Sequence, residues 1–184
     1  MNISELNEFN IFEHYQKLAG KTLVDKGVFK NKSHCILGLI GEYNELIDAI
    51  KNVDSTNIKE ELGDMAWFIV NIMTLYDINF EDVQLDIDYY GHKTLRTEEL
   101  LYHISELANE MKRELIFDKP IVDYFQGYVR NILAEIESIA AYFRIPIEET
   151  LISNLKKLEN RNKNKGIGDM ENRDLTTERN ILEQ

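Results

Sequence analysis

Cysteine, proline and long apolar runs are scarce in this chain of 184 residues. Cys35 is the only cysteine, so an intramolecular disulfide and a zinc site built from thiolates are both excluded, and it is expected to be buried. Two prolines and nine glycines leave few places for sharp turns. No apolar run approaches the ~20 residues that span a bilayer, and no basic region precedes an apolar one at the N-terminus. These absences predict a cytoplasmic protein with long regular elements and no membrane partner.

Positive charge is also in short supply. The chain carries 21 Lys and Arg against 33 Asp and Glu, for a formal net charge of -12. A nucleic-acid polymer is therefore not expected as a partner, because binding to its phosphates relies on Lys and Arg. A single nucleotide is not excluded, since a divalent metal held by carboxylates reverses the local sign of charge and accepts phosphate oxygens.

Apolar residues recur at helical spacing along most of the chain, which predicts an all-α fold. The six expected helices cover about 4–20, 32–51, 58–76, 97–115, 122–143 and 149–160. A further helix start is expected after Asp82, and the polar tail after Lys163 is expected to be a loop or disordered. The connection at 52–57 is short and rich in N-cap residues, so the second and third expected helices should be antiparallel neighbours.

Two pairs of acidic residues stand beside the apolar stripes of these two helices. Glu42 and Glu45 lie on one flank of the second expected helix, and Glu61 and Asp64 lie on the same flank of the third. Antiparallel neighbours bring both pairs to one place, where four carboxylates repel one another unless a cation binds. The hard oxygen ligands predict Mg²⁺, with Mn²⁺ as the alternative ion.

Three glycines accompany the acidic pairs. Gly38, Gly41 and Gly63 each cost a helix ~1 kcal/mol relative to alanine, so they predict close approach by another backbone or by a ligand. The alternative is that the acids are a solvated flank and the glycines only allow helices to pack. Trp67 and Phe68 are expected to be core residues rather than a stacking platform for a base. The four histidines form no metal-binding cluster in the sequence.

A weak internal echo relates the two halves of the chain. Residues 75–83 resemble residues 142–150, each being the end of an apolar helix, a turn and an acidic helix start. This register aligns Tyr128 with Glu61 and Asn131 with Asp64. Separately, residues 104–109 loosely match residues 40–45 and align Glu106 with Glu42, so Glu106 is the one acid of the four that the second half keeps. The second half is therefore either a degenerate copy of the first or merely another helical segment.

The sequence around the acidic pairs also resembles a motif of a known protein family. Leu37–Leu46 followed by Glu60–Asp64 resembles the Glu-x-x-Glu and Glu-x-x-Asp motif of the MazG-like, all-α nucleoside triphosphate pyrophosphohydrolases. Near the C-terminus, Asn154–Arg161 and Gly166–Arg173 resemble weaker motifs of the same family. The resemblance implies an antiparallel helical bundle of this type with extra helices, which would be an insertion or the degenerate repeat. It implies one domain over 1–165, with a catalytic half at about 10–85, an extra half at about 97–160 and a tail at 166–184.

The activity implied by the resemblance is Mg²⁺-dependent hydrolysis of a (deoxy)nucleoside triphosphate between its α and β phosphates. The implied metal ligands, which are also the catalytic residues, are Glu42, Glu45, Glu61 and Asp64. Any of these acids, Glu45 among them, could accept the proton of the attacking water. The residues expected to bind the substrate are Asn154, Lys157, Arg161 and Arg173. A homo-oligomer is expected, with a dimer favoured, although an internal repeat would replace one subunit contact.

Two alternatives stay open from the sequence. One is a dUTP- or dCTP-selective hydrolase of the related dimeric dUTPase type. The other is an acidic helical interaction module without catalytic activity, which would not bind Mg²⁺.

Overall fold

The computed structural model describes residues 3–8, 10–80, 83, 95–164 and 175–182, and within them it contains helices and no strands. The prediction of an all-α fold is confirmed. A 3₁₀ turn at Ile3–Glu5 precedes α1 (Ile11–Gly20), α2 (Val28–Lys51), α3 (Ser55–Leu75), α4 (Thr97–Phe117), α5 (Phe125–Tyr142), α6 (Ile147–Asn164) and α7 (Leu175–Leu182). None of the helices in the described part of the chain combines the length and the apolar character that a bilayer crossing requires.

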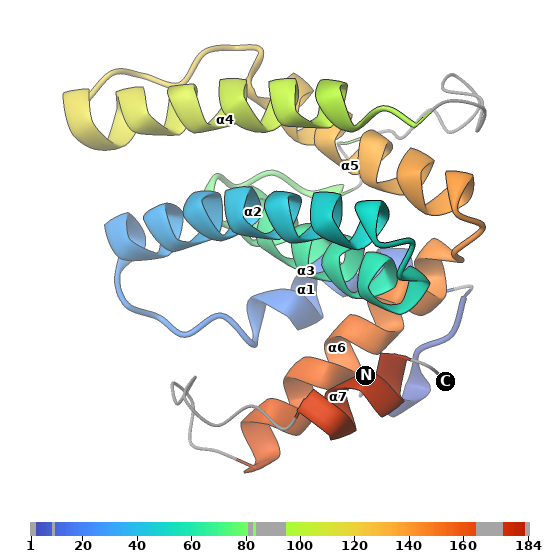
Figure 1. The fold of residues 1–184 in the computed structure, drawn as a ribbon. Helices are drawn as coiled ribbons and strands as arrows, with labels where there is room; N and C mark the ends of the chain where they lie inside the picture. Colours follow the sequence, from blue (N-terminus) through green and yellow to red (C-terminus); the bar gives the residue numbers. More distant parts are fainter. Residues whose placement is uncertain (1–2, 9, 81–82, 84–94, 165–174, 183–184) are drawn as a thin grey trace.

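Two helical hairpins form most of the molecule (Figure 1). α2 and α3 make the most extensive contact, and α4 and α5 form the second hairpin. α4 packs on α2 and α5 packs on α3, while α1, α6 and α7 also contact α3. Since α3 is surrounded by other helices, it is apolar around most of its circumference, with Leu62, Met65 and Ile69 fully buried.

The turn between α2 and α3 fixes the direction of the first hairpin. Asp54 is the N-cap of α3, and its side chain accepts a hydrogen bond from the backbone N–H of Asn57 at 3.2 Å. Val53 has a left-handed backbone with φ 54°, which turns the chain within three residues. The prediction of a short, capped connection between antiparallel neighbours is confirmed.

The N-terminal helix begins later than predicted. Its expected start near Ser4 is wrong, because a 3₁₀ turn ends at Glu5 and α1 begins only at Ile11. The side chain of Asn10 accepts a hydrogen bond from the Asn7 N–H at 2.9 Å and donates one to the Glu5 carbonyl at 3.2 Å. These local bonds compete with helical backbone bonds, as asparagine side chains often do.

The expectation of a loop or disorder throughout the C-terminal tail is wrong for residues 175–182. They form α7, which contacts α6 and α3. Leu182 is buried, and the Lys59 Nζ donates a hydrogen bond to its carbonyl oxygen at 3.0 Å. Polar composition suggested no structure, but tertiary contacts at the end of the tail stabilise a helix. The helix start expected after Asp82 lies outside the described residues.

Gly38 allows α3 to approach α2 closely. A Cβ atom at this position would overlap the ring of Phe68, so the space next to Gly38 is filled by an aromatic side chain. Phe68 and Trp67 are both buried, and Trp67 Nε1 donates to Thr22 Oγ1 at 2.7 Å. The expectation that both aromatic residues belong to the core is confirmed. The expected close approach at Gly38 is by a side chain, rather than by a backbone or a ligand.

We expect the substitution Gly38→Ala to lower the free energy of unfolding by about 1–3 kcal/mol, because the added methyl group displaces the Phe68 ring. The better helix propensity of alanine offsets only ~1 kcal/mol of this loss. Gly41→Ala is the matched control, since nothing lies within 4 Å of a Cβ built there. Urea unfolding of both variants checks the prediction, and equal stability changes would contradict it.

The two hairpins end in the same way. Asp77 follows α3 and Arg144 follows α5, and both have left-handed backbones, with φ values of 55° and 57°. The next residue in each case donates a backbone hydrogen bond to a carbonyl five residues earlier, from Ile78 to Met73 at 2.9 Å and from Ile145 to Ala140 at 2.8 Å. This is a Schellman-type helix end in both halves, at positions that the internal echo aligns.

Candidate metal centre

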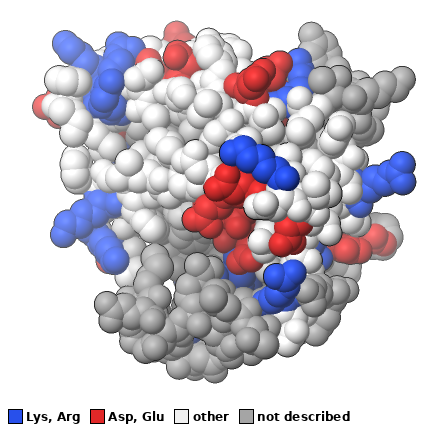
Figure 2. Space-filling view, viewed as in Figure 1, with Lys and Arg blue, Asp and Glu red and all other residues white. Residues whose placement is uncertain are grey.

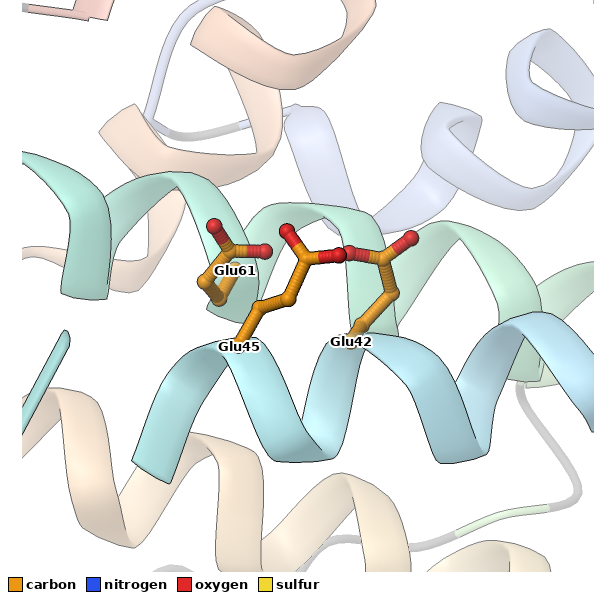
Figure 3. A group of neighbouring side chains, drawn as sticks. All are labelled: Glu42, Glu45 and Glu61. Carbon is orange, nitrogen blue, oxygen red and sulfur yellow. The ribbon is translucent and has the colours of Figure 1, made fainter. Parts of the chain in front are cut away.

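Three carboxylates converge between α2 and α3. Glu42 and Glu45 extend from successive turns of α2, and Glu61 extends from α3 toward them (Figure 3). One oxygen from each side chain can be chosen so that all three lie within 4.8 Å of one another. Acidic side chains gather near the middle of the face that carries α2 (Figure 2). The structure therefore brings together three of the four acids that the sequence predicted as one site.

The three carboxylates differ in burial. Glu45 is exposed, Glu42 is half-buried and Glu61 is only 8% exposed. The Glu61 Oε2 atom is buried and has no hydrogen-bond partner. A buried carboxylate oxygen without a partner is costly, whereas a bound cation would satisfy it. Glu61 is thus the residue whose environment points most directly to a ligand.

Burial makes ionisation of the two inner acids unfavourable. It is the main cause that raises the pKa of Glu61 to about 9, and the hydrogen bond with Glu42 and the charge of Asp64 add to the effect. Burial likewise raises the pKa of Glu42 to about 7, followed by the charge of Asp64. Near neutral pH, a protonated Glu61 therefore donates its hydrogen bond to the Glu42 carboxylate. A cation that binds here must displace protons.

Asp64, the fourth predicted acid, lies outside this three-carboxylate group and already accepts three hydrogen bonds from two side chains. Asn154 Nδ2 donates to Asp64 Oδ1 at 2.6 Å. Lys157 Nζ donates to Oδ1 at 2.7 Å and to Oδ2 at 2.6 Å. Asp64 is nevertheless close enough to Glu42 and Glu61 for its charge to raise both of their pKa values. Asp64 therefore borders the group of Glu42, Glu45 and Glu61 on the side that faces α6.

Lys157 is a fully buried cation with two acidic partners. Its side chain is 0% exposed, and besides Asp64 it contacts Glu60 Oε1 at 3.1 Å. A buried ammonium group is tolerated only when paired in this way. Asn154 and Lys157 were predicted to bind substrate, and their partners in this structure are acidic side chains of α3. Glu60 was missed, although its position four residues before Asp64 puts both on one helical face.

Tyr15 on α1 completes the surroundings of Asp64, a role that was not predicted. Its hydroxyl is buried 3.0 Å from Asn154 Oδ1 and 3.3 Å from the Gly63 carbonyl. Burial, followed by the charge of Asp64, holds the pKa of Tyr15 well above its ordinary value, so the hydroxyl stays a hydrogen-bond donor. Gly63 lets α6 approach, because a Cβ there would lie 3.1 Å from the Cβ of Asn154.

Of the two arginines predicted to bind the substrate, the structure describes Arg161. Arg161 lies one turn beyond Lys157 on α6 and is half-buried. Arg173, with the 166–173 motif, lies outside the described residues. Cys35 is buried in the core, as expected, and takes no part in the site.

The chemistry of the donor set fits a hard divalent cation. Glutamate oxygens are the ligands that Mg²⁺ and Mn²⁺ prefer, and the three members of this group are all glutamates. Because Glu45 is exposed, solvent reaches one side of the group. The arrangement can therefore hold a cation and present it to an anionic substrate.

Comparison with known proteins agrees with this reading of the α2–α3 hairpin. Residues 30–87 match the family model of the MazG nucleotide pyrophosphohydrolase domain. The matched segment includes Glu42, Glu45, Glu61 and Asp64, so the predicted resemblance is confirmed for the part of the chain that carries the site. No curated protein and no solved structure matches the chain.

Proposed function

From the match of residues 30–87 to the family model of the MazG nucleotide pyrophosphohydrolase domain, we propose that the protein hydrolyses nucleoside triphosphates between the α and β phosphates. Water adds to one phosphorus, the bridging P–O bond breaks, and the products are the nucleoside monophosphate, pyrophosphate and a released proton. The observation that carries the proposal is the convergence of three glutamates within this segment, one of them with a buried, unpartnered oxygen.

The proposed cofactor is Mg²⁺, with Mn²⁺ as the alternative ion. Glu42, Glu45 and Glu61 would be its ligands, and Asp64 is proposed as the fourth carboxylate of the centre. The orphaned Glu61 Oε2 supports this assignment. When bound, such an ion neutralises phosphate charge and lowers the pKa of a coordinated water.

The residues of the chain would divide the remaining work. Glu45 is the exposed member of the group, so it is the carboxylate we assign to accept the proton of the attacking water. Arg161 and Arg173 remain the proposed contacts to the triphosphate. The bonds of Asn154 and Lys157 to Asp64 favour a role for this pair in holding that carboxylate.

A nucleotide panel tests the proposed activity. With Mg²⁺ present, we expect pyrophosphate and a monophosphate from at least one canonical or modified (deoxy)nucleoside triphosphate, and no activity after the metal is removed with EDTA. Release of orthophosphate and a diphosphate would contradict the proposed cleavage position. A strong preference for dUTP or dCTP would select the alternative of a base-selective hydrolase. No hydrolysis of any nucleotide, without Mg²⁺ binding, would select the non-catalytic interaction module.

We propose that the second hairpin is the degenerate copy that the sequence echo suggested, rather than an insertion. The shared helix ends support this, and so does the pairing of α2 with α4 and of α3 with α5, which is how two copies related by a two-fold axis would meet. Tyr128 donates to Glu106 Oε2 at 3.4 Å, at the positions aligned with Glu61 and Glu42, which also share a hydrogen bond. The domain limits of 1–165 and 166–184 remain part of this proposal.

The expected dimer and the cytoplasmic location remain proposals too. The internal pairing of the two hairpins supplies one contact that a second subunit would otherwise supply. Sedimentation of the active protein distinguishes a dimer from a monomer whose halves pair internally.

A further inference from the structure

A buried chain of hydrogen bonds runs from α1 through α6 to Asp64 on α3. Tyr15 and Asn154 are both essentially inaccessible to solvent, and the Tyr15 hydroxyl lies 3.0 Å from Asn154 Oδ1. On the other side of the same carboxamide, Nδ2 donates to Asp64 Oδ1 at 2.6 Å. Three helices therefore meet through two side chains at the carboxylate that borders the three-glutamate group.

The chemistry of each group fixes the direction of these bonds. An ionised Asp64 only accepts hydrogen bonds, so the NH₂ end of Asn154 must face it. The Oδ1 end then faces Tyr15, and the hydroxyl is the donor that this oxygen needs. Without the hydroxyl, a buried carbonyl oxygen would lose its donor, at a cost typical of an unsatisfied buried polar group. Tyr15 thus favours one of the two orientations of the amide.

We propose that Tyr15 is a positioning residue of the metal centre, which acts through Asn154 to fix the Asp64 carboxylate beside Glu42 and Glu61. Lys157 supplies the opposite charge on the same carboxylate. Asp64 then accepts three hydrogen bonds from two α6 residues, Asn154 and Lys157, before any ligand arrives. The inference rests on the proposed function, because a fixed Asp64 carboxylate matters only if a metal ion binds at this centre.

The test compares Tyr15→Phe with Tyr76→Phe. The control also removes a partly buried hydroxyl that serves a carboxylate, since the Tyr76 O–H donates to Glu114 Oε2 at 2.6 Å. We expect Tyr15→Phe to weaken Mg²⁺ binding, measured by calorimetry, by roughly tenfold, as supporting residues of metal sites commonly do. Tyr76→Phe should lower the melting temperature and leave Mg²⁺ affinity within twofold of the wild type.

A double-mutant cycle separates positioning from general damage. In an Asp64→Asn background, adding Tyr15→Phe should cause no further loss of Mg²⁺ affinity, because the carboxylate that it positions is absent. An undiminished tenfold loss in that background would overturn the inference, as would wild-type affinity in the single Tyr15→Phe variant.

A second measurement does not depend on metal. In ¹⁵N spectra, the side-chain amide protons of Asn154 should exchange slowly with solvent in the wild type and much faster in Tyr15→Phe. Unchanged exchange would overturn the inference. A wild-type protein that binds no Mg²⁺ would overturn the proposed function instead, and the amide exchange would still decide whether Tyr15 positions Asn154.

Discussion

Glu61→Gln is expected to lower Mg²⁺-dependent hydrolysis by about a hundredfold or more, because changes even in supporting residues of a metal site cost 10–100-fold. The substitution keeps the shape of the side chain and prevents a negative charge at the most buried of the proposed ligands. We also expect Mg²⁺ to raise the melting temperature of the wild type and not that of the variant. Initial rates of pyrophosphate release and thermal melts with and without Mg²⁺ measure the two effects.

Glu106→Gln is the matched control for this variant. Glu106 lies on α4 and accepts a hydrogen bond from Tyr128, at the position that the internal echo aligns with Glu42. It should keep wild-type rates and the full response to Mg²⁺, since it belongs to the second hairpin. Wild-type Mg²⁺ affinity in Glu61→Gln would remove the basis for placing the ion between α2 and α3.

Mg²⁺ affinity is expected to rise by at least about a hundredfold between pH 6 and pH 8. The pKa of Glu61 is raised to about 9, so an ion that binds in this range displaces its proton, and linkage gives about tenfold per pH unit for each proton released. Glu42, with a pKa of about 7, adds to the effect in the lower part of the range. The charges of Glu45 and Asp64 act in the same direction, and Lys157 opposes them at Glu42. Calorimetry in two buffers of different ionisation enthalpy measures both the affinity and the protons released.

The metal-free protein should show the opposite trend in stability. Both acids have higher pKa values in the folded protein than the ordinary 4.5, so the folded state binds more protons than the unfolded state. Stability is then favoured at low pH and decreases as the pH rises from about 5 toward 9. Glu61→Gln should flatten this decrease in melting temperature. A metal-free wild type that becomes more stable over this range would contradict the raised pKa values.

Much of the fold was predictable because helical periodicity is a local property. The apolar stripe of α2 and the capped turn at Asp54 each depend on residues that are close to one another in the sequence. They were sufficient to place α2 beside α3 and to bring Glu42, Glu45 and Glu61 into one group. The start of α1 was not predictable in this way, since side-chain bonds of Asn10 replaced the helical pattern.

The surroundings of Asp64 were not predictable from spacing. Its partners Asn154 and Lys157 come from α6, about ninety residues further along the chain. Their positions on one helical face suggested a phosphate-binding surface, and only the packing of α6 on α3 shows that Lys157 is buried. A local sequence pattern does not predict burial that comes from contacts with distant parts of the chain. Helix α7 was unexpected for the same reason, since it forms contacts with α3 and α6.

The buried Lys157 links the matched segment, residues 30–87, to a helix that lies outside it. Residues 30–87 contain all four acids, yet Lys157, the fully buried ammonium group that contacts Glu60 and Asp64, comes from α6. If this segment were expressed alone, both acids would lose their contact with Lys157, and α3 would lose its contacts with α6. We therefore expect the unit that folds to be larger than the segment recognisable by sequence, and a transplant of the candidate centre into another protein to need α6 as well.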